Sequence, residues 1–266
     1  MTALRAPPAE RTIEELLSFG VVNLDKPPGP SAHQVSAWIR DAAGVERAAH
    51  AGTLDPKVTG CLPVLLGDAT RLAQVFLQGS KEYVAVLELH GPAPTDLDAV
   101  LETFEGEIYQ KPPRKSAVAR RLRTREIYDL DLLEVRDRQA LVRIRCESGT
   151  YIRKLCHDLG LAAGTGAHMG DLRRTATAPF DDRTLVSTAD VTDALAFAED
   201  GDEAPLRDTV APAERALSHL PGLTVAFSAA EQIAEGAPVY APGVVGVGDA
   251  VETADKGTLV ACFTPD

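Results

Sequence analysis

The segment from His50 to Gly60 places the tightest constraint on how this chain can fold. It reads HAGTLDPKVTG, with one carboxylate, Asp55, directly before Pro56. Proline fixes its own φ and pushes the preceding residue toward extended geometry, while Gly52 and Gly60 let the backbone turn tightly or approach a ligand closely. We therefore expect a rigid loop that aims the carboxylate. The other interpretation is an ordinary turn with a solvated Asp, because both residues are favoured in turns for local reasons.

Length and composition favour a globular protein with a large domain and a small one. The chain has 266 residues, of which 45% are apolar, yet it contains no apolar run long enough to span a membrane and no apolar signal core at its N-terminus. We expect a soluble, cytoplasmic protein without membrane contact. The four cysteines are widely spaced, which predicts neither a disulfide framework nor a metal site.

Charge is segregated along the chain. A net charge of −12 argues against a nucleic-acid partner, because phosphate binding draws on Lys and Arg. Residues 111–125, however, carry seven basic residues and no acid, whereas residues 181–208 carry nine acids against two arginines. The basic run is either a solvated face or a phosphate-binding segment. The abundance of Asp and Glu elsewhere suggests a surface adapted to high salt.

Hydrophobic patterns predict alternating strands and helices. A strand over 21–25 leads to a helix capped by Ser31, whose expected apolar face is Val35, Trp38, Ile39 and Ala42. A second helix is expected over 68–78, a strand over 83–89, a third helix over 95–105, and a hairpin from the β runs 127–135 and 140–147.

A further helix is predicted over residues 150–161. Ile152, Leu155, Cys156 and Leu159 recur at i, i+3, i+4 and i+7 and define its buried stripe. This spacing places Arg153 on a different face, away from the core. A strand over 169–177 follows.

Six blocks of sequence carry a resemblance to a known family. They are NLDKPPGPSAH (23–33), HAGTLDPKVTGCLP (50–63), KEYVAVLELHG (81–91), YQKPPRKSAVARRLRTREIY (109–128), ESGTYIRKLCHDLG (147–160) and GAHMGDLRRT (166–175). In order and spacing these blocks resemble the TruB/Cbf5 family of RNA pseudouridine synthases, and the fourth is similar to the archaeal Cbf5 branch, which is the catalytic subunit of box H/ACA guide-RNA particles. The resemblance spans residues 12–262.

The resemblance implies a metal-free and cofactor-free isomerase in which Asp55 is the catalytic residue. Tyr83 matches the tyrosine that stacks on the flipped base, Arg153 the arginine that pairs with the aspartate, and Lys26 a support for the loop. The RNA- or substrate-binding positions implied are His50, Leu172, Arg114, Lys115, Arg120, Arg121 and Arg123. Without the resemblance, Tyr83 is better interpreted as a strand aromatic that fills the core, Leu172 fits the core equally well, and Arg153 is a surface arginine of a helix.

The fold implied is α+β, with a mixed, mainly antiparallel sheet flanked by helices and a small β-barrel resembling a PUA domain. The expected divisions are an N-terminal extension (1–20), a catalytic domain (21–180), an acidic helical linker (181–216) and a PUA-like domain (217–266) that stops before the family's closing strands. The implied partners are a guide RNA, target rRNA or tRNA, and the proteins Nop10, Gar1 and L7Ae. Two alternatives remain: a guide-independent synthase acting on the tRNA T-loop, and an RNA-binding scaffold with dispensable catalysis.

Overall fold

A single large mixed sheet organises the chain. The computed structural model describes residues 4–77, 79–112 and 119–266. The strands of the large sheet lie between Gly20 and Pro212. Its strand order is β10-β1-β3-β8-β4-β7-β6-β5, with β2 added beside β3 and β9 beside β8. The β3–β8 pair is parallel and the other pairs are antiparallel, so the predicted α+β class with a mainly antiparallel mixed sheet is confirmed. The strands are β1 (Gly20–Lys26), β2 (Ala48–His50), β3 (Thr59–Leu66), β4 (Lys81–Leu89), β5 (Gly106–Gln110), β6 (Arg123–Arg136), β7 (Gln139–Cys146), β8 (Ala167–Thr177), β9 (Phe180–Asp181) and β10 (Ala211–Pro212).

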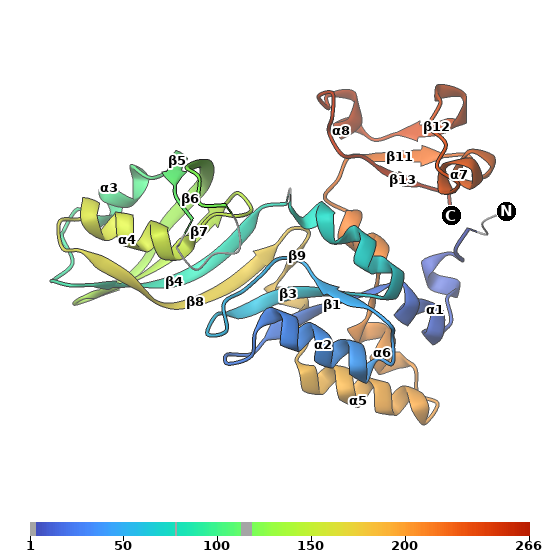
Figure 1. Cartoon of the computed structure of the whole chain (residues 1–266), viewed down its shortest axis with the longest axis horizontal. Coiled ribbons are helices and arrows are strands. Elements are labelled where there is room, and N and C mark those ends of the chain that lie inside the picture. Colours follow the sequence, from blue (N-terminus) through green and yellow to red (C-terminus); the bar gives the residue numbers. More distant parts are fainter. Residues whose placement is uncertain (1–3, 78, 113–118) are drawn as a thin grey trace.

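Helices cover both halves of this sheet (Figure 1). Near β5, β6 and β7 lie α3 (Leu97–Glu102) and α4 (Ile152–Ala162), whereas α2 (Ala32–Ala42), α5 (Thr188–Glu199) and α6 (Ala204–Thr209) lie near β1 and β3. The chain before β1 forms η1 (Pro8–Glu10) and α1 (Ile13–Ser18). Helix α4 packs mainly on β8. The two halves of the sheet meet near its centre, where β3 and β8 run side by side.

The helix after Ser31 forms as predicted, but its exposed face differs from the expectation. The Ser31 hydroxyl accepts a hydrogen bond from the amide of Gln34, and the Ser31 amide donates one to the side-chain Oε1 of Gln34, a capping box that fixes the start of α2. Val35 and Ile39 are buried, but Trp38 is 52% exposed. The expectation that Trp38 and Ala42 face the core was wrong, because both are exposed and the buried stripe of this helix follows Ala32, Val35 and Ile39.

The segment that follows β3 also differs from its expected form. Residues Gly67–Leu77 form η2, a 3-10 helix rather than the expected α-helix. Within it Phe76 is buried against Phe180, with ring centroids 6.2 Å apart, so the segment packs on the sheet through its end.

Residues 181–216 are not a free linker. They contain the two α-helices α5 and α6, together with η3 (Asp182–Thr184) and η4 (Ala213–Leu217). Val191 and Ala194 of α5 and Leu206 of α6 share one apolar cluster with residues of β1, β3 and α2. The acidic residues of this segment lie outside that cluster, so its helices complete the core rather than only joining two domains.

The β6–β7 hairpin and α4 agree with the sequence patterns. Arg136 pairs with Gln139 across the turn, and Ile152, Leu155, Cys156 and Leu159 are all buried. This buried stripe leaves the opposite face of α4, including Arg153 in its first turn, turned away from the core.

Residues after η4 build a second, smaller sheet. Its order is β12-β11-β13, formed by Val244–Val247, Gly222–Val225 and Ala261–Phe263, with β11 and β13 parallel. Helices α7 (Phe227–Ala234) and α8 (Asp249–Glu252) and the turn η5 (Ala241–Gly243) surround it. Figure 1 shows this sheet apart from the large one and on the side where the chain begins. Within the described residues, no helix combines the length and apolar character that a membrane crossing requires.

Candidate active site

Asp55 lies in a loop that connects two antiparallel strands, β2 and β3. Gly52 and Gly60 have φ angles of 101° and 98°, a region that L side chains rarely adopt, so glycine is needed at both ends. At Gly60 a Cβ atom would also lie 2.2 Å from the carbonyl oxygen of Arg174 on β8, which excludes a side chain there. The loop therefore presses closely on the sheet while the Asp55 side chain remains 54% exposed.

Lys26 holds this loop from below. It ends β1, is fully buried, and its Nζ donates hydrogen bonds to the carbonyl oxygens of Pro27 at 2.9 Å, Pro56 at 3.0 Å and Val58 at 2.8 Å. An ammonium group has three protons, so all of its donors are used. Burial lowers the pKa of Lys26 from its ordinary value, and the carboxylate of Asp55 acts in the opposite direction. A buried cation thus lies close to the exposed carboxylate.

Arg153 brings a second cation to Asp55. Its Nη2 donates a hydrogen bond to Oδ2 of Asp55, so the two side chains form an ion pair. The arginine is 60% exposed and comes from the first turn of α4, whose opposite face is buried. The pairing that the resemblance implied is therefore present in the structure.

Tyr83 lies in the sheet close to this loop and is nearly buried. It is on β4, opposite Arg174 of β8, with 9% of its surface exposed, and it belongs to the main apolar cluster. Burial raises the pKa of its hydroxyl above the ordinary value, while the neighbouring Arg174 acts in the opposite direction. The hydroxyl therefore stays protonated at neutral pH and can donate a hydrogen bond.

His50 is the last residue of β2, and Leu172 lies in the middle of β8. Leu172 is half-buried, packs against the main apolar cluster and is paired with Ala85. His50 is half-buried, and burial together with the positive charges of Arg174 and His33 lowers its pKa. The imidazole of His50 is therefore neutral at neutral pH. Its Nδ1 atom is buried and has no hydrogen-bond partner among the described residues.

The basic segment extends from the end of β5 into β6. Arg120 and Arg121 are exposed and Arg123 is half-buried, and the hydrogen bonds of Arg120 and Arg123 go to carbonyl oxygens of the same segment, those of Pro112 and Ala119. Arg114 and Lys115, the other two expected RNA-binding residues here, lie outside the described residues. The part of this segment that is described thus presents free positive charge to solvent.

Two buried cations of the large sheet were missed by the reasoning from sequence. Arg174 is 1% exposed and donates hydrogen bonds to the carbonyl oxygens of Cys61 at 2.7 Å and Gly52 at 3.3 Å. Lys81 is 4% exposed and donates to the carbonyls of Phe76 at 2.8 Å and Gly79 at 2.9 Å. For Lys81 a signal existed, because it shares the two-residue alternation of Tyr83, Ala85, Leu87 and Leu89, all of which face inward.

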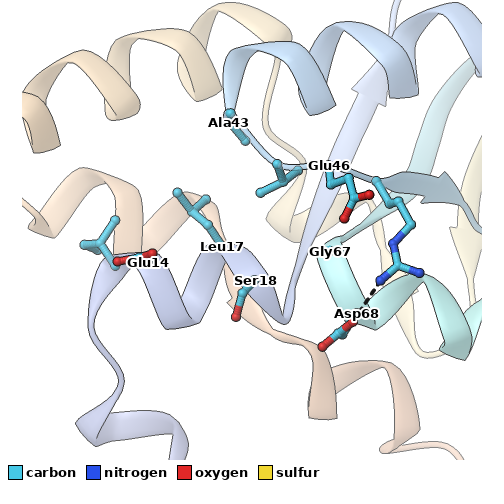
Figure 2. A pocket seen from close by; sticks show the side chains of 11 residues that line it. Glu14, Leu17, Ser18, Ala43, Glu46, Gly67 and Asp68 are labelled. Atoms are coloured by element: carbon cyan, nitrogen blue, oxygen red, sulfur yellow. Dashed lines mark hydrogen bonds and ion pairs between the residues drawn. The ribbon is translucent and has the colours of Figure 1, made fainter.

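A cleft of the described residues lies elsewhere. It has a volume of about 460 Å³ and lies between α1, the end of α2 and the start of η2, as Figure 2 shows. Glu14, Glu46 and Asp68 contribute carboxylates to its wall, and Asp68 accepts a hydrogen bond from Arg47 at 3.0 Å. None of the residues expected at the catalytic site lines this cleft, so it is separate from the site around Asp55.

The described residues contain no cluster of three or more His, Cys, Asp or Glu side chains suited to hold a metal ion. Cys61, Cys146 and Cys156 are free and buried, and burial raises the pKa of Cys61 to about 11 and that of the other two to about 12. These thiols are therefore protonated and poorly nucleophilic. The reactive group that this part of the molecule offers is the Asp55 carboxylate, which can act as a nucleophile or a base.

Known protein families match most of the chain. A model of the TruB family pseudouridylate synthase N-terminal domain matches residues 40–96 and 91–152, and one of the tRNA pseudouridylate synthase B C-terminal domain matches residues 153–218. The DKCLD (NUC011) domain matches residues 5–36. The second match includes the helices α5 and α6 that the sequence analysis had assigned to a linker.

Similar proteins support the same assignment. A probable tRNA pseudouridine synthase B of Haloarcula marismortui is 68% identical, over 99% of this chain and 85% of its own. One of Pyrococcus abyssi is 49% identical, over 97% of this chain and 77% of its own. A crystal structure of a Cbf5-Nop10-Gar1 complex superposes with a TM-score of 0.93 at 47% identity, over 100% of this chain and 80% of that one. An H/ACA RNP bound to a substrate RNA containing 2′-deoxyuridine gives 0.89 at 45% identity, over 97% and 78%.

A fold shared with the Cbf5 structures, together with family matches that run from the Asp55 loop through Arg153 and β8, places this chain in the TruB/Cbf5 family of pseudouridine synthases, which are isomerases.

Proposed function

We propose that this enzyme isomerises uridine to pseudouridine in RNA with Asp55 as its catalytic residue. The observation that carries the proposal is the ion pair of Asp55 with Arg153 above a loop anchored by Lys26. The reaction breaks the N-glycosidic bond between uracil N1 and ribose C1′, turns the base over and forms a bond from C5 to C1′. C5 then gives up its proton while N1 takes up a proton from solvent, so the product is an isomer of uridine. One carboxylate can serve these steps, first as nucleophile or base and later as proton acceptor.

The target nucleotide must leave its stack to reach Asp55. Unstacking and unpairing cost about a few kcal/mol, which contacts to the flipped base must repay. In our proposal Tyr83 offers its ring to the base, Leu172 forms an apolar wall and His50 contacts the RNA beside the target. The buried phenol of Tyr83 and the half-buried Leu172 support this arrangement, because both lie on strands that border the Asp55 loop.

The basic segment binds phosphates in this proposal. Arg120 and Arg121 are exposed on the chain between β5 and β6, Arg123 is half-buried at the start of β6, and Arg114 and Lys115 belong to the same run of sequence. Neutralising phosphates with arginines releases counterions, so affinity falls as salt concentration rises. A salt-adapted protein of net charge −12 needs further RNA contacts to compensate, and these come from a particle.

We further propose that the enzyme acts as the catalytic subunit of an H/ACA guide-RNA particle in the cytoplasm, with Nop10, Gar1 and L7Ae, on rRNA and on position 55 of tRNA. The similarity to a Cbf5-Nop10-Gar1 complex over 100% of this chain supports Nop10 and Gar1 as partners. A specific observation also supports a second candidate, modification of tRNA without a guide, because the curated relatives are named probable tRNA pseudouridine synthases.

Reconstitution separates the two candidates. The chain is incubated with a tRNA transcript alone, and then with a guide RNA, Nop10, Gar1, L7Ae and an rRNA fragment, and modified positions are mapped each time. We expect rRNA modification only in the complete mixture. Full-rate tRNA modification by the chain alone would replace our partner set with the guide-independent reading.

Replacing Asp55 tests the catalytic assignment. Asp55→Asn keeps the size of the side chain but removes the charge, and we expect pseudouridine formation in the reconstituted particle to fall below detection while RNA affinity stays within about threefold. Asp158→Asn is the matched control, because Asp158 forms an ion pair with Lys154 on the same helix as Arg153. Substantial turnover by Asp55→Asn would remove Asp55 from the mechanism, whereas loss of turnover in both variants would point to a general effect on the fold.

A further inference from the structure

Arg174 is among the largest fully buried side chains of the protein, and its hydrogen bonds go to neutral groups. It is 1% exposed, and the carbonyl oxygens of Cys61 and Gly52 accept its protons at 2.7 and 3.3 Å. A buried charge is costly unless its donors are satisfied, and a carboxylate partner would supply more attraction than a carbonyl does. A guanidinium at this position therefore lowers the stability of the fold, and its contacts indicate a role that compensates for this cost.

The guanidinium joins the two ends of the Asp55 loop. Gly52 comes three residues before Asp55 and Cys61 six residues after it, so hydrogen bonds to both carbonyls close the loop at its base. The backbone of Arg174 contributes as well, because its carbonyl oxygen leaves no room for a Cβ atom at Gly60. Lys26 binds the carbonyls of Pro56 and Val58 inside the loop, whereas Arg174 binds its two ends.

The same side chain also acts on the residues proposed to contact the base. Tyr83 lies directly opposite Arg174 in the β4–β8 pairing, and the guanidinium opposes the rise that burial produces in the pKa of Tyr83. Its charge also contributes to the lowered pKa of His50. One guanidinium therefore lies within electrostatic reach of Tyr83 and His50 while it holds the loop that carries Asp55.

We propose that Arg174 is a positioning residue for the isomerisation, which holds both ends of the Asp55 loop in register with Tyr83. It does not touch the reacting atoms. The planar fork of arginine can reach two carbonyls in different directions, and the ammonium group of lysine cannot match this geometry from the same strand position. The inference rests on the proposed catalytic role of Asp55, so its test needs a measurement that does not depend on activity.

The test compares Arg174→Met, Arg174→Lys and Lys81→Met in the reconstituted particle. Lys81→Met is the matched control, because Lys81 is an equally buried cation on the neighbouring strand whose hydrogen bonds go to Phe76 and Gly79, away from the loop. Hydrogen–deuterium exchange of the amides of residues 51–61 reports on the loop. Single-turnover rates and RNA dissociation constants report on the reaction.

For Arg174→Met we expect faster exchange in residues 51–61 than in the rest of the sheet, and a single-turnover rate about 100-fold lower with RNA affinity within about threefold, the size that misplacing a catalytic group by about 1 Å produces. Arg174→Lys should recover part of both effects, and it provides the comparison if Arg174→Met does not fold. Lys81→Met should leave loop exchange and rate near those of the wild type.

Unchanged loop exchange in both Arg174 variants would overturn the proposal. Equal loosening of the loop by Lys81→Met would also overturn it, because the effect would then be one of core stability. If Asp55→Asn keeps its turnover, the proposed function fails, but the exchange of residues 51–61 still decides whether Arg174 holds the loop.

Discussion

Asp55 and Arg153 form an ion pair although 98 positions separate them in the chain. Both side chains are more than half exposed, at 54% and 60%. Ion pairs exposed to this degree contribute roughly 0 to 1 kcal/mol to stability, because water screens them. The pair therefore adds little to the fold. In the proposed function, RNA bound at this site excludes water and strengthens the pair, because the attraction between two charges grows as the local dielectric constant falls.

Removing the arginine should affect the reaction and not the fold. For Arg153→Ala we expect the unfolding free energy to change by less than about 1 kcal/mol, and the single-turnover rate to fall about 100-fold as the carboxylate loses its orientation. Arg153→Lys keeps the charge without the planar fork and should recover only part of the rate. The control is His157→Ala, one turn later on the exposed face of α4. A normal rate for Arg153→Ala across the pH range would contradict the pairing role.

Tyr83→Phe separates the ring from the hydroxyl. Burial raises the pKa of this hydroxyl, so it is a neutral hydrogen-bond donor at neutral pH. Loss of one hydrogen bond of about 1.4 kcal/mol predicts a rate about tenfold lower, with RNA affinity unchanged because the ring remains. Tyr128→Phe is the control, since Tyr128 lies on β6, where its ring contacts Arg145 of β7, and Tyr83 lies on β4. An unaltered rate for Tyr83→Phe would limit Tyr83 to packing.

Much of this site follows from local rules. The stripe Ile152, Leu155, Cys156 and Leu159 predicts α4, and the same spacing turns Arg153 away from the core, where it meets Asp55. Gly52 and Gly60 were interpreted as points of tight turning or close approach, and both have positive φ. What Gly60 approaches, the carbonyl of Arg174, depends on the parallel pairing of β3 with β8, which no local pattern contains.

The differences also have physical causes. Trp38 fits the apolar periodicity of α2, but the buried side of that helix is set by its contacts with β3 and α5. The acidic stretch after Asp181 reads as solvated, yet its few apolar side chains on α5 and α6 are enough to complete a core cluster. Arg174 escapes detection because the pairing of β8 with β4 is irregular, which breaks the alternation that would indicate an inward side chain.

Lys26→Met should destabilise the protein. The substitution keeps the length of the side chain but leaves the carbonyls of Pro27, Pro56 and Val58 without their donor. An unsatisfied buried acceptor costs about 1 to 3 kcal/mol, and removing a buried charge offsets part of the sum, so we expect a loss of about 2 to 4 kcal/mol in the free energy of unfolding by urea. Lys57→Met, exposed in the same loop, serves as the control. Equal stability of the two variants would mean that Lys26 does not anchor the loop.

Lys81 should make stability depend on pH in the alkaline range. Burial, with the charge of Arg174 as a smaller cause, lowers its pKa from 10.5 to about 8. Below pH 8 the folded and unfolded chains both carry the proton, and the native state bears the full cost of the buried charge. Between pH 8 and 10.5 the native state releases its proton while the unfolded state keeps it, so this contribution to the unfolding free energy rises with pH.

The rise amounts to about 3.5 kcal/mol, at about 1.4 kcal/mol for each unit of pKa. Urea unfolding of the wild type and of Lys81→Met at a series of pH values from neutral to alkaline measures it as the difference between the two proteins, which cancels the other titrating groups. We expect the wild type to gain stability relative to Lys81→Met as the pH increases, and Lys57→Met to run parallel to the wild type. Parallel curves for all three proteins would show that Lys81 titrates alike in the folded and unfolded chains.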